Sequence, residues 1–215
     1  DKPKILADIN GDPFIFHLLS YLEQAGALRV ILCTGYLHNK IEEWVSTSYL
    51  GSINVELSQE RKPLGTAGAI KNAQELIGSD NFIVLNGDTY LKIDYQSFIN
   101  FFTIQSMAIG AIAVKKVNNI NRYGRISANG QGKIISFAEK KISGKGYINA
   151  GIYIFKKNIL NMIPADQYFS LEKEVFPHIV EKDNRHLYIY SVKDYFVDIG
   201  TPESYRQASK DMIKK

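Results

Sequence analysis

Two aspartates stand where the chain could hold phosphate groups and a metal ion. Asp88 ends the string VLNGD at 84–88, directly after an apolar run, and Asp198 lies inside the apolar run 195–199. A carboxylate at the carboxyl end of a parallel strand lies where open α/β sheets bind their ligands. Gly87 beside it would let a phosphate or a ribose approach the backbone closely. An unpaired charge such as Asp198 within an apolar strand is costly, and a bound metal ion would remove that cost.

Magnesium is the metal that this pattern favours. Mg²⁺ prefers oxygen ligands and is often held by one or two carboxylates together with substrate phosphates. The two aspartates are far apart in the sequence, so a shared site requires a fold whose strands bring them to one end. The simpler alternatives are that Asp88 is an ordinary turn residue and that Asp198 caps the next helix or meets a lysine. Thr201 belongs to the start of that helix, which could hold an anion.

A run of small residues leads into a predicted helix at 60–68. Backbone amide and carbonyl groups there are open to a flat ligand, so a base or a ribose could be recognised. A plain loop-to-helix junction explains the pattern equally well, and the chain has no GxxxxGK[ST] string. The residues that we assign to nucleotide binding are Glu60, Pro63, Leu64, Gly65, Thr66, Ala67, Gly68 and Gly87.

Lysine and amide side chains supply further candidates for phosphate and sugar contacts. Lys4 precedes an apolar run, and Lys140 follows Glu139 at the end of a predicted strand. A lysine serves as a point charge for phosphate oxygens, although most lysines are solvated surface residues. Asn149 and Gly151 lie within an aromatic strand, where the amide suits recognition of sugar hydroxyls. The alternative interpretation of Gly151 is a β-bulge or close strand packing.

Alternating helices and strands would position these residues. Helical spacing and glycine stops predict helices, and β-rich apolar runs predict strands between them. This order indicates a parallel or mixed sheet with helices on both faces, followed after residue 120 by a β-rich half that covers one side of the cleft. We expect one domain over residues 1–215, with helices at 14–25, 39–45, 66–77, 94–105, 170–176 and 202–213, strands at 29–34, 53–58, 81–85, 108–116, 146–155, 187–192 and 195–199, and a hairpin formed by 124–128, 129–132 and 133–139.

Composition and charge are those of an ordinary globular domain. The 215 residues are 45% hydrophobic and 22% charged, with a net charge of +4 that suits small polyanionic substrates. No run approaches the roughly 20 apolar residues of a membrane span, and no signal sequence opens the chain. We therefore expect a cytoplasmic protein with no membrane partner. The lack of a basic stripe interleaved with aromatics argues against nucleic acid. Cys33 is predicted to be a core thiol, and the aromatic content leaves room for a homodimer interface.

Taken in order, the motifs resemble those of the sugar nucleotidyltransferase family. The similarity spans essentially the whole chain and rests on Pro3-Lys4, PLGTAG at 63–68, VLNGD at 84–88, FAEK at 137–140, NAGIYIF at 149–155 and DIGTP at 198–202. The resemblance implies a Rossmann-like α/β fold, with a mixed, mostly parallel sheet flanked by helices and a β-rich sugar-binding half. It implies an enzyme that joins a nucleoside triphosphate and a sugar 1-phosphate into a nucleotide sugar and releases pyrophosphate.

The resemblance also implies roles for single residues. Asp88 and Asp198 would hold Mg²⁺, and Lys4 would contact the triphosphate as part of the catalytic set. Lys140 would contact the sugar phosphate, and segment 60–68 would surround the base and the ribose. The positions that match the sugar pocket of the family are Glu139, Asn149 and Gly151.

Two features of the resemblance concern the substrate and the start of the chain. SLEKEVFP at 170–177 and YFVDIGTPESY at 195–205 look similar to guanylyltransferases that use GTP and D-glycero-D-manno-heptose 1-phosphate. Enzymes for mannose, glucose and N-acetylmuramate 1-phosphates share most of these strings. The family also has a first strand and a loop like GGxGTRL before the Pro-Lys pair, and without that strand its neighbours' edges are exposed. A non-catalytic subunit that senses a nucleotide sugar is the alternative from another class.

Overall fold

Apolar runs and the turn residues between them set most elements of the chain at the predicted places. The computed structural model describes residues 2–138, 144–182 and 185–212. The strands are β1 (Asp8–Ile9), β2 (Asp12–Pro13), β3 (Arg29–Thr34), β4 (Asn54–Gln59), β5 (Asn81–Leu85), β6 (Thr89–Leu91), β7 (Ala108–Val117), β8 (Arg125–Ala128), β9 (Ile134–Ala138), β10 (Gly146–Lys156), β11 (His186–Val192) and β12 (Phe196–Asp198).

The helices begin and end with local signals that the sequence carries. The Asp94 carboxylate accepts the Ser97 amide at 3.1 Å and so caps α4. The predicted helix 66–77 is shorter, because the chain tightens into a 3-10 turn after residue 72, and the predicted helix 170–176 is a π-helical turn that leads into α5. The helices are α1 (Phe14–Gln24), α2 (His38–Thr47), α3 (Gly65–Asn72), α4 (Tyr95–Thr103), α5 (Phe176–Lys182) and α6 (Pro202–Asp211), with 3-10 turns at Lys4–Leu6, Gln74–Leu76 and Lys157–Met162 and the π turn at Leu171–Val175.

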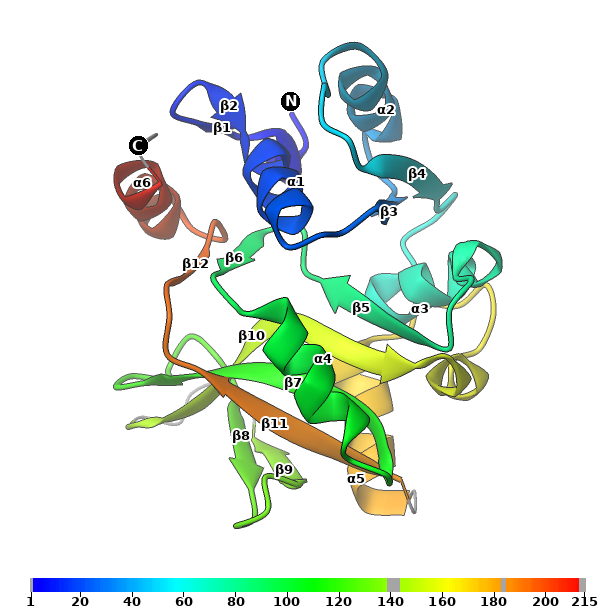
Figure 1. The fold of residues 1–215 in the computed structure, drawn as a ribbon, viewed down its shortest axis with the longest axis vertical. Coiled ribbons are helices and arrows are strands. Elements are labelled where there is room, and N and C mark those ends of the chain that lie inside the picture. The colour runs from blue at the N-terminus through cyan, green and yellow to red at the C-terminus, as the bar shows by residue number, and fades with distance from the viewer. Residues whose placement is uncertain (1, 139–143, 183–184, 213–215) are drawn as a thin grey trace.

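The main sheet is mixed and is built around β10 (Figure 1). Its order is β11-β7-β10-β8-β9, and β5 also pairs with β10. The α/β class and the mixed sheet are confirmed: of the described strands, β5, β7, β8 and β11 run in one direction, and β9 and β10 run in the other. Among the hydrogen-bonded pairs of described strands in this sheet, β11 with β7 is parallel, while β10 is antiparallel to each of β5, β7 and β8. Strand β10 runs antiparallel to its neighbours because it follows the β8–β9 hairpin rather than a crossover helix.

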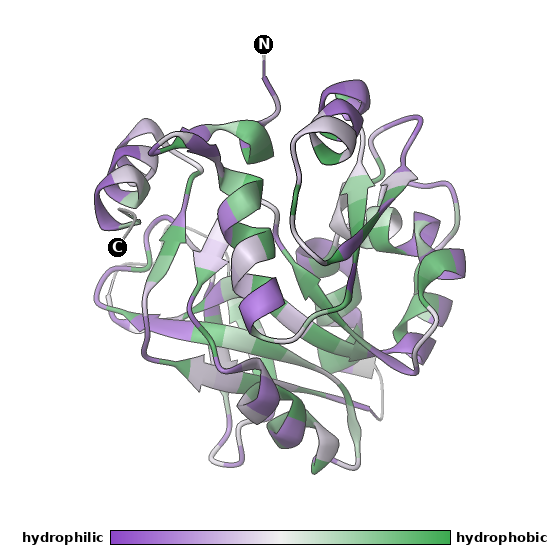
Figure 2. Ribbon diagram, turned by 45° about the horizontal axis from the view of Figure 1, so that its top comes forward, coloured by the Kyte–Doolittle hydropathy of each residue, from purple (hydrophilic) through white to green (hydrophobic). Residues whose placement is uncertain are grey.

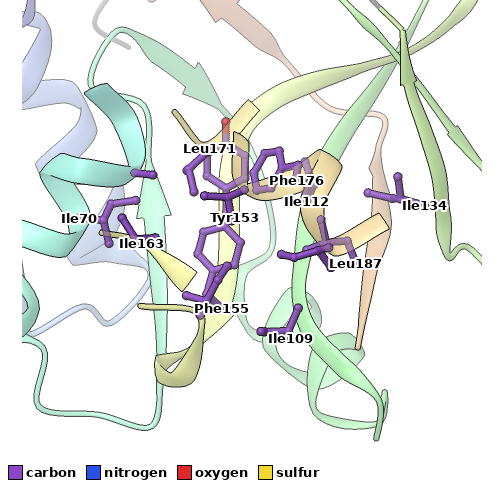
Figure 3. Packing of buried hydrophobic residues seen from close by; sticks show 14 of the residues in the cluster. Ile70, Ile109, Ile112, Ile134, Tyr153, Phe155, Ile163, Leu171, Phe176 and Leu187 are labelled. Carbon is purple, nitrogen blue, oxygen red and sulfur yellow. The ribbon is translucent and has the colours of Figure 1, made fainter. Parts of the chain in front are cut away.

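Both faces of this sheet are buried, and the pleat divides its side chains between two clusters. Tyr153 and Phe155 of β10 belong to the cluster under α5, whereas Ile152 and Ile154 belong to the cluster under α4. Figure 3 shows the first cluster, with the Tyr153 ring among aliphatic and aromatic side chains. In Figure 2 α1 alternates hydrophobic and hydrophilic residues, whereas α6 near the C-terminus is mostly hydrophilic. No helix in the described parts of the chain is long and apolar enough to cross a membrane.

An apolar groove separates two strands that the chain leaves partly unpaired. Among the described residues, β3 pairs only with β4, and β5 pairs only with β10. The groove between them has a volume of about 1240 Å³ and is lined by both strands and by residues of α1, α3 and α4. The prediction of β3 as a buried strand and of Cys33 as a core thiol is therefore wrong, because Cys33 lines this groove and is exposed there.

Candidate active site

A short antiparallel pair brings the two predicted aspartates together at the end of β5. Asp198 lies directly opposite Thr89 in the pairing of β12 with β6. The Ile199 amide also donates to the Asp88 carbonyl at 2.9 Å. Asp88 directly precedes Thr89, so these two pairings place Asp88 and Asp198 on adjacent backbone segments. They meet through β6, a strand of three residues that the sequence pattern missed, rather than through a shared edge of parallel strands.

Lys4 contacts Asp88 and lies on the same side of the site as Asp198. Its ammonium donates to Asp88 Oδ2 at 2.6 Å. The same ammonium lies 3.7 Å from the point where a Cβ on Gly200 would be, and Asp198 Oδ1 lies 2.7 Å from that point. A glycine at this turn therefore keeps the space between the lysine and Asp198 open. The structure brings the predicted triphosphate lysine to the predicted metal ligands.

Asp198 is surrounded by donors that keep it ionised. Tyr123 OH donates to Oδ2 at 2.5 Å, the Gly200 amide donates to Oδ1 at 3.0 Å, and Arg122 Nη2 lies 3.2 Å from Oδ1. Burial by itself raises the pKa of this carboxyl, but the donors and the guanidinium charge outweigh it, so its pKa lies below the ordinary value. Burial, with Asp198 second, raises the pKa of Tyr123 to about 12, so Tyr123 stays protonated as a donor.

The donor set fits a divalent metal ion held partly by substrate. The described residues contain no group of three or more histidine, cysteine, aspartate or glutamate side chains that could enclose a metal ion. Two carboxylates whose remaining ligands come from phosphates and water are the arrangement that Mg²⁺ commonly uses. Asp88 and Asp198, two carboxylates on adjacent backbone segments, therefore suit such an ion.

The small residues of the predicted nucleotide segment have a packing reason that the sequence did not reveal. A Cβ on Gly65 would lie 2.7 Å from the Phe169 carbonyl oxygen, and a Cβ on Gly68 would lie 2.6 Å from the Gln167 carbonyl oxygen. Gly65 also has φ +70°, which favours glycine. The Ala67 amide donates to the Phe169 carbonyl at 2.9 Å, so part of this backbone is already paired. The glycines let the chain at 167–169 lie against the segment.

The remaining members of the segment divide between support and open surface. Glu60 Oε2 accepts the Leu64 amide at 3.1 Å and so closes the loop before α3. Pro63 and Thr66 are exposed, whereas Leu64 and Ala67 are buried. The segment borders the groove at Thr66, and Gly87 and Asp88 line the same groove. The nucleotide and metal candidates thus line the same groove.

Asn149 and Gly151 form a bulge in β10. The register with β7 shifts between Asn149 and Tyr153, and Gly151 has φ +72°. Asn149 Oδ1 accepts the Gly151 amide at 3.0 Å, and Asn149 Nδ2 donates to Tyr153 OH at 2.8 Å. A Cβ on Gly151 would lie 2.9 Å from Asn86 Nδ2, so the glycine is required by close packing. The bulge brings Gly151 next to Asn86, directly after β5, and the Asn86 backbone amide donates to the Gly151 carbonyl at 2.8 Å.

A glutamate that the sequence did not single out connects these segments. Glu172, on the π turn, accepts hydrogen bonds from Thr66 Oγ1 at 3.1 Å, from Ser170 Oγ at 3.1 Å and from Tyr153 OH at 3.3 Å. Thr66 is 106 positions away in the sequence, so no local spacing could have revealed the contact. The string SLEKEVFP drew attention only through its family resemblance.

The other three residues that we predicted to bind the sugar phosphate are Thr201, Glu139 and Lys140. The Thr201 hydroxyl accepts the Ser204 amide at 3.2 Å and caps α6 as part of a capping box, so that hydroxyl already has a structural partner. Glu139 and Lys140 lie outside the described residues, so their assignment to the sugar phosphate stays a prediction.

Comparison with known proteins identifies the class to which this fold and site correspond. A family model described as Nucleotidyl transferase matches residues 1–215, and the chain belongs to this family. It is 37% identical over 205 residues to D-glycero-alpha-D-manno-heptose 1-phosphate guanylyltransferase of Campylobacter jejuni, covering 95% of this chain and 88% of the relative. The enzyme of that description from Aneurinibacillus thermoaerophilus is 34% identical, covering 99% of this chain and 90% of the relative.

A solved structure agrees with this fold over nearly the whole chain. HddC from Yersinia pseudotuberculosis superposes with a TM-score of 0.89 at 36% identity, covering 98% of this chain and 90% of HddC. A second structure of HddC, complexed with GMP-PN, superposes with a TM-score of 0.88.

Proposed function

We propose that this protein is a guanylyltransferase that joins GTP and D-glycero-D-manno-heptose 1-phosphate into GDP-heptose and pyrophosphate. The observation that carries the proposal is the convergence of Lys4, Asp88 and Asp198 at the end of β5. The choice of GTP and heptose is supported by relatives described as heptose 1-phosphate guanylyltransferases and by the guanine nucleotide bound to HddC.

The reaction needs little chemistry from the protein beyond positioning. A phosphate oxygen of the sugar 1-phosphate attacks the α-phosphorus of GTP and forms a new P–O bond. The bond from that phosphorus to the oxygen bridging the β-phosphorus breaks, and pyrophosphate leaves with the electron pair. The nucleophile is already an anion at neutral pH, so no protein general base is required. The main obstacle is repulsion, which reaches about 4 kcal/mol for two unit charges 4 Å apart at an effective dielectric of 20.

The charged side chains would lower that repulsion. Asp88 and Asp198 would hold Mg²⁺, which supplies positive charge and alignment to the phosphate oxygens. Lys4 would bring a further positive charge to the triphosphate from beside Asp88, and Lys140 would do the same for the sugar phosphate. Catalysis would then rest on positioning and electrostatics, as phosphoryl transfer generally does.

The apolar groove is the second part of the proposal. We infer that one β-strand from residues preceding Asp1 fills the groove and pairs with both β3 and β5. Residues 1–215 and this strand would then form one domain. Two neighbouring strand edges without a partner among the described residues, and an apolar lining, are what a missing central strand leaves behind. The end of such a strand would lie near Lys4 and Gly87, which line the groove, where a glycine-rich loop could reach the triphosphate.

Product analysis tests the proposed function. The protein, carrying its natural residues before Asp1, is incubated with Mg²⁺, each nucleoside triphosphate in turn and a pool of sugar 1-phosphates that includes those of heptose, mannose and glucose. GDP-heptose and pyrophosphate are the expected products by mass spectrometry. Another nucleotide sugar would correct the substrate, and a folded protein that binds nucleotide sugar without making it would replace the enzyme by a sensing subunit.

A further inference from the structure

The polar network around Glu172 joins the two halves of the candidate site. Its carboxylate is partly buried and projects from the π turn into the space between α3 and β10. One oxygen, Oε2, accepts from Thr66 in the nucleotide segment, and the other, Oε1, accepts from Tyr153 in β10. In both hydrogen bonds the hydroxyl donates and a carboxylate oxygen accepts. We call these two connections the Thr66 arm and the Tyr153 arm. A π turn is a rare distortion of a helix that is frequent at functional sites.

The Tyr153 arm fixes the orientation of Asn149. Tyr153 is fully buried, and burial, followed by the charge of Glu172, raises the pKa of its hydroxyl well above the ordinary value. The hydroxyl therefore stays protonated, donates to Glu172 and accepts from Asn149 Nδ2. In Figure 3 the hydroxyl oxygen of Tyr153 lies beside Leu171 at the start of the π turn. Asn149 Oδ1 is then left to accept the Gly151 amide, so the amide cannot flip without breaking two hydrogen bonds.

The Thr66 arm fixes the start of α3. The Thr66 hydroxyl donates to Glu172 and at the same time accepts the Leu171 amide at 2.8 Å. Both hydrogen-bonding roles of this hydroxyl are thus used within the protein. Thr66 and Asn149 are in this way connected through a single carboxylate, although they lie on different elements.

We propose that Glu172 is a positioning residue that couples nucleotide binding at 64–68 to sugar-phosphate binding at Asn149. This inference rests on the proposed function, because it assigns the two segments to the two substrates. A ligand that orders one segment also fixes the position of the Glu172 carboxylate. The carboxylate then keeps the other segment in its binding geometry. Glu172 itself touches neither substrate.

Cross effects between the arms test the coupling. Thr66→Val removes the Thr66 arm, and we expect it to raise the KM for heptose 1-phosphate roughly 3- to 10-fold, the factor of one net hydrogen bond. Tyr153→Phe removes the other arm and should raise the KM for GTP by a similar factor, while kcat changes less than either KM. In a Glu172→Ala background, Thr66→Val should leave the KM for heptose 1-phosphate unchanged, because the connection is already lost.

Conservative variants separate coupling from simple structural support. Thr66→Ser keeps the hydroxyl and should restore both KM values to within about 2-fold of wild type. Glu181→Ala, an exposed glutamate on α5, serves as the matched control and should change neither KM. Additive losses with no cross effect, in variants that remain folded, would overturn the proposal and leave Glu172 as a packing residue.

The outcome stays separate from that of the proposed function. Turnover by the wild-type protein decides whether it is a guanylyltransferase. Where turnover fails, the same cross effect is measured by calorimetry as the Kd of GTP with and without heptose 1-phosphate. Equal Kd values for GTP in the two conditions, in both wild type and Glu172→Ala, would also overturn the coupling.

Discussion

Gly68→Ala separates two reasons for the glycine in the PLGTAG string. If the glycine exists only to let a nucleotide approach, alanine should stabilise the folded protein, because alanine is favoured over glycine in a helix by about 1 kcal/mol. The structure predicts the opposite. The new Cβ would lie 2.6 Å from the Gln167 carbonyl oxygen and 3.0 Å from the Leu64 Cβ.

The neighbouring backbone has little freedom to move away. Phe169 donates its amide to the Leu64 carbonyl at 2.8 Å, and its own carbonyl accepts the amides of Ala67 and Gly68 at 2.9 and 3.1 Å. Relieving the clash therefore lengthens hydrogen bonds worth about 1 kcal/mol each. Overpacking itself costs about 1–3 kcal/mol. Set against the gain in helix propensity, the net loss of unfolding free energy is about 1–3 kcal/mol.

The assay is thermal and urea unfolding of Gly68→Ala beside a matched control. For a protein of this size, 1 kcal/mol corresponds to roughly 2–4 °C in Tm, so we expect a fall of about 3–10 °C. Gly78→Ala is the control, because a Cβ there meets nothing within 4 Å, and it should leave stability unchanged or raise it by up to about 1 kcal/mol. A Gly68→Ala protein as stable as wild type, with weakened nucleotide binding alone, would refute the packing argument and restore the ligand explanation.

Three further predictions concern the metal site, the sugar phosphate and the groove. Asp198→Asn should abolish pyrophosphate release while circular dichroism stays native, and near-normal activity in a folded double variant with Asp88→Asn would reject the metal assignment. Lys140→Ala should raise the KM for the sugar phosphate and spare that for GTP; an unchanged sugar-phosphate dependence would exclude this role. Cys33 is accessible from the groove, but desolvation by the apolar groove walls, followed by the charge of Glu60, raises its pKa to about 11, so alkylation of a protein starting at Asp1 should accelerate toward pH 11. With the preceding residues present Cys33 should be protected, and equal rates in both proteins would argue against a strand in the groove.

The sequence predicts best where apolar runs end in glycine or asparagine. The bounds of β3 and β5 match the predicted strands 29–34 and 81–85, and the turn at 129–132 correctly predicts the β8–β9 hairpin. The burial of a strand is harder to predict from the sequence, because it depends on partners elsewhere in the chain. Strand β3 has a buried-strand composition, yet it borders the groove and is largely exposed or half-buried.

The site was predicted in part, and its limits have physical causes. Residue type and neighbouring turns were enough to select Asp88 and Asp198, whereas Lys4 was assigned through the family resemblance; the structure brings the three residues together. The strands that join them, β6 and β12, have three residues each and carry no periodicity that a pattern could detect. Glycines are ambiguous for another reason, because the sequence does not show which group occupies the space that a missing Cβ leaves. At Gly68 that neighbour is the protein's own backbone.

The ion pairs on the two aspartates bear on how the site accepts charged ligands. Lys4 and Asp88 have side chains that are 46% and 40% exposed, and Arg122, which pairs with Asp198, is 48% exposed. Exposed pairs contribute only about 0–1 kcal/mol, so we expect Lys4 to turn from Asp88 to a substrate phosphate at little cost. The Arg122–Asp198 pair is held more firmly, because the Asp198 side chain is only 16% exposed. A divalent ion that replaced Lys4 and Arg122 at Asp88 and Asp198 would still balance the charges of both carboxylates. Incoming phosphates therefore meet carboxylates whose charge is already balanced, and the repulsion that two bare aspartates would exert on a triphosphate does not arise.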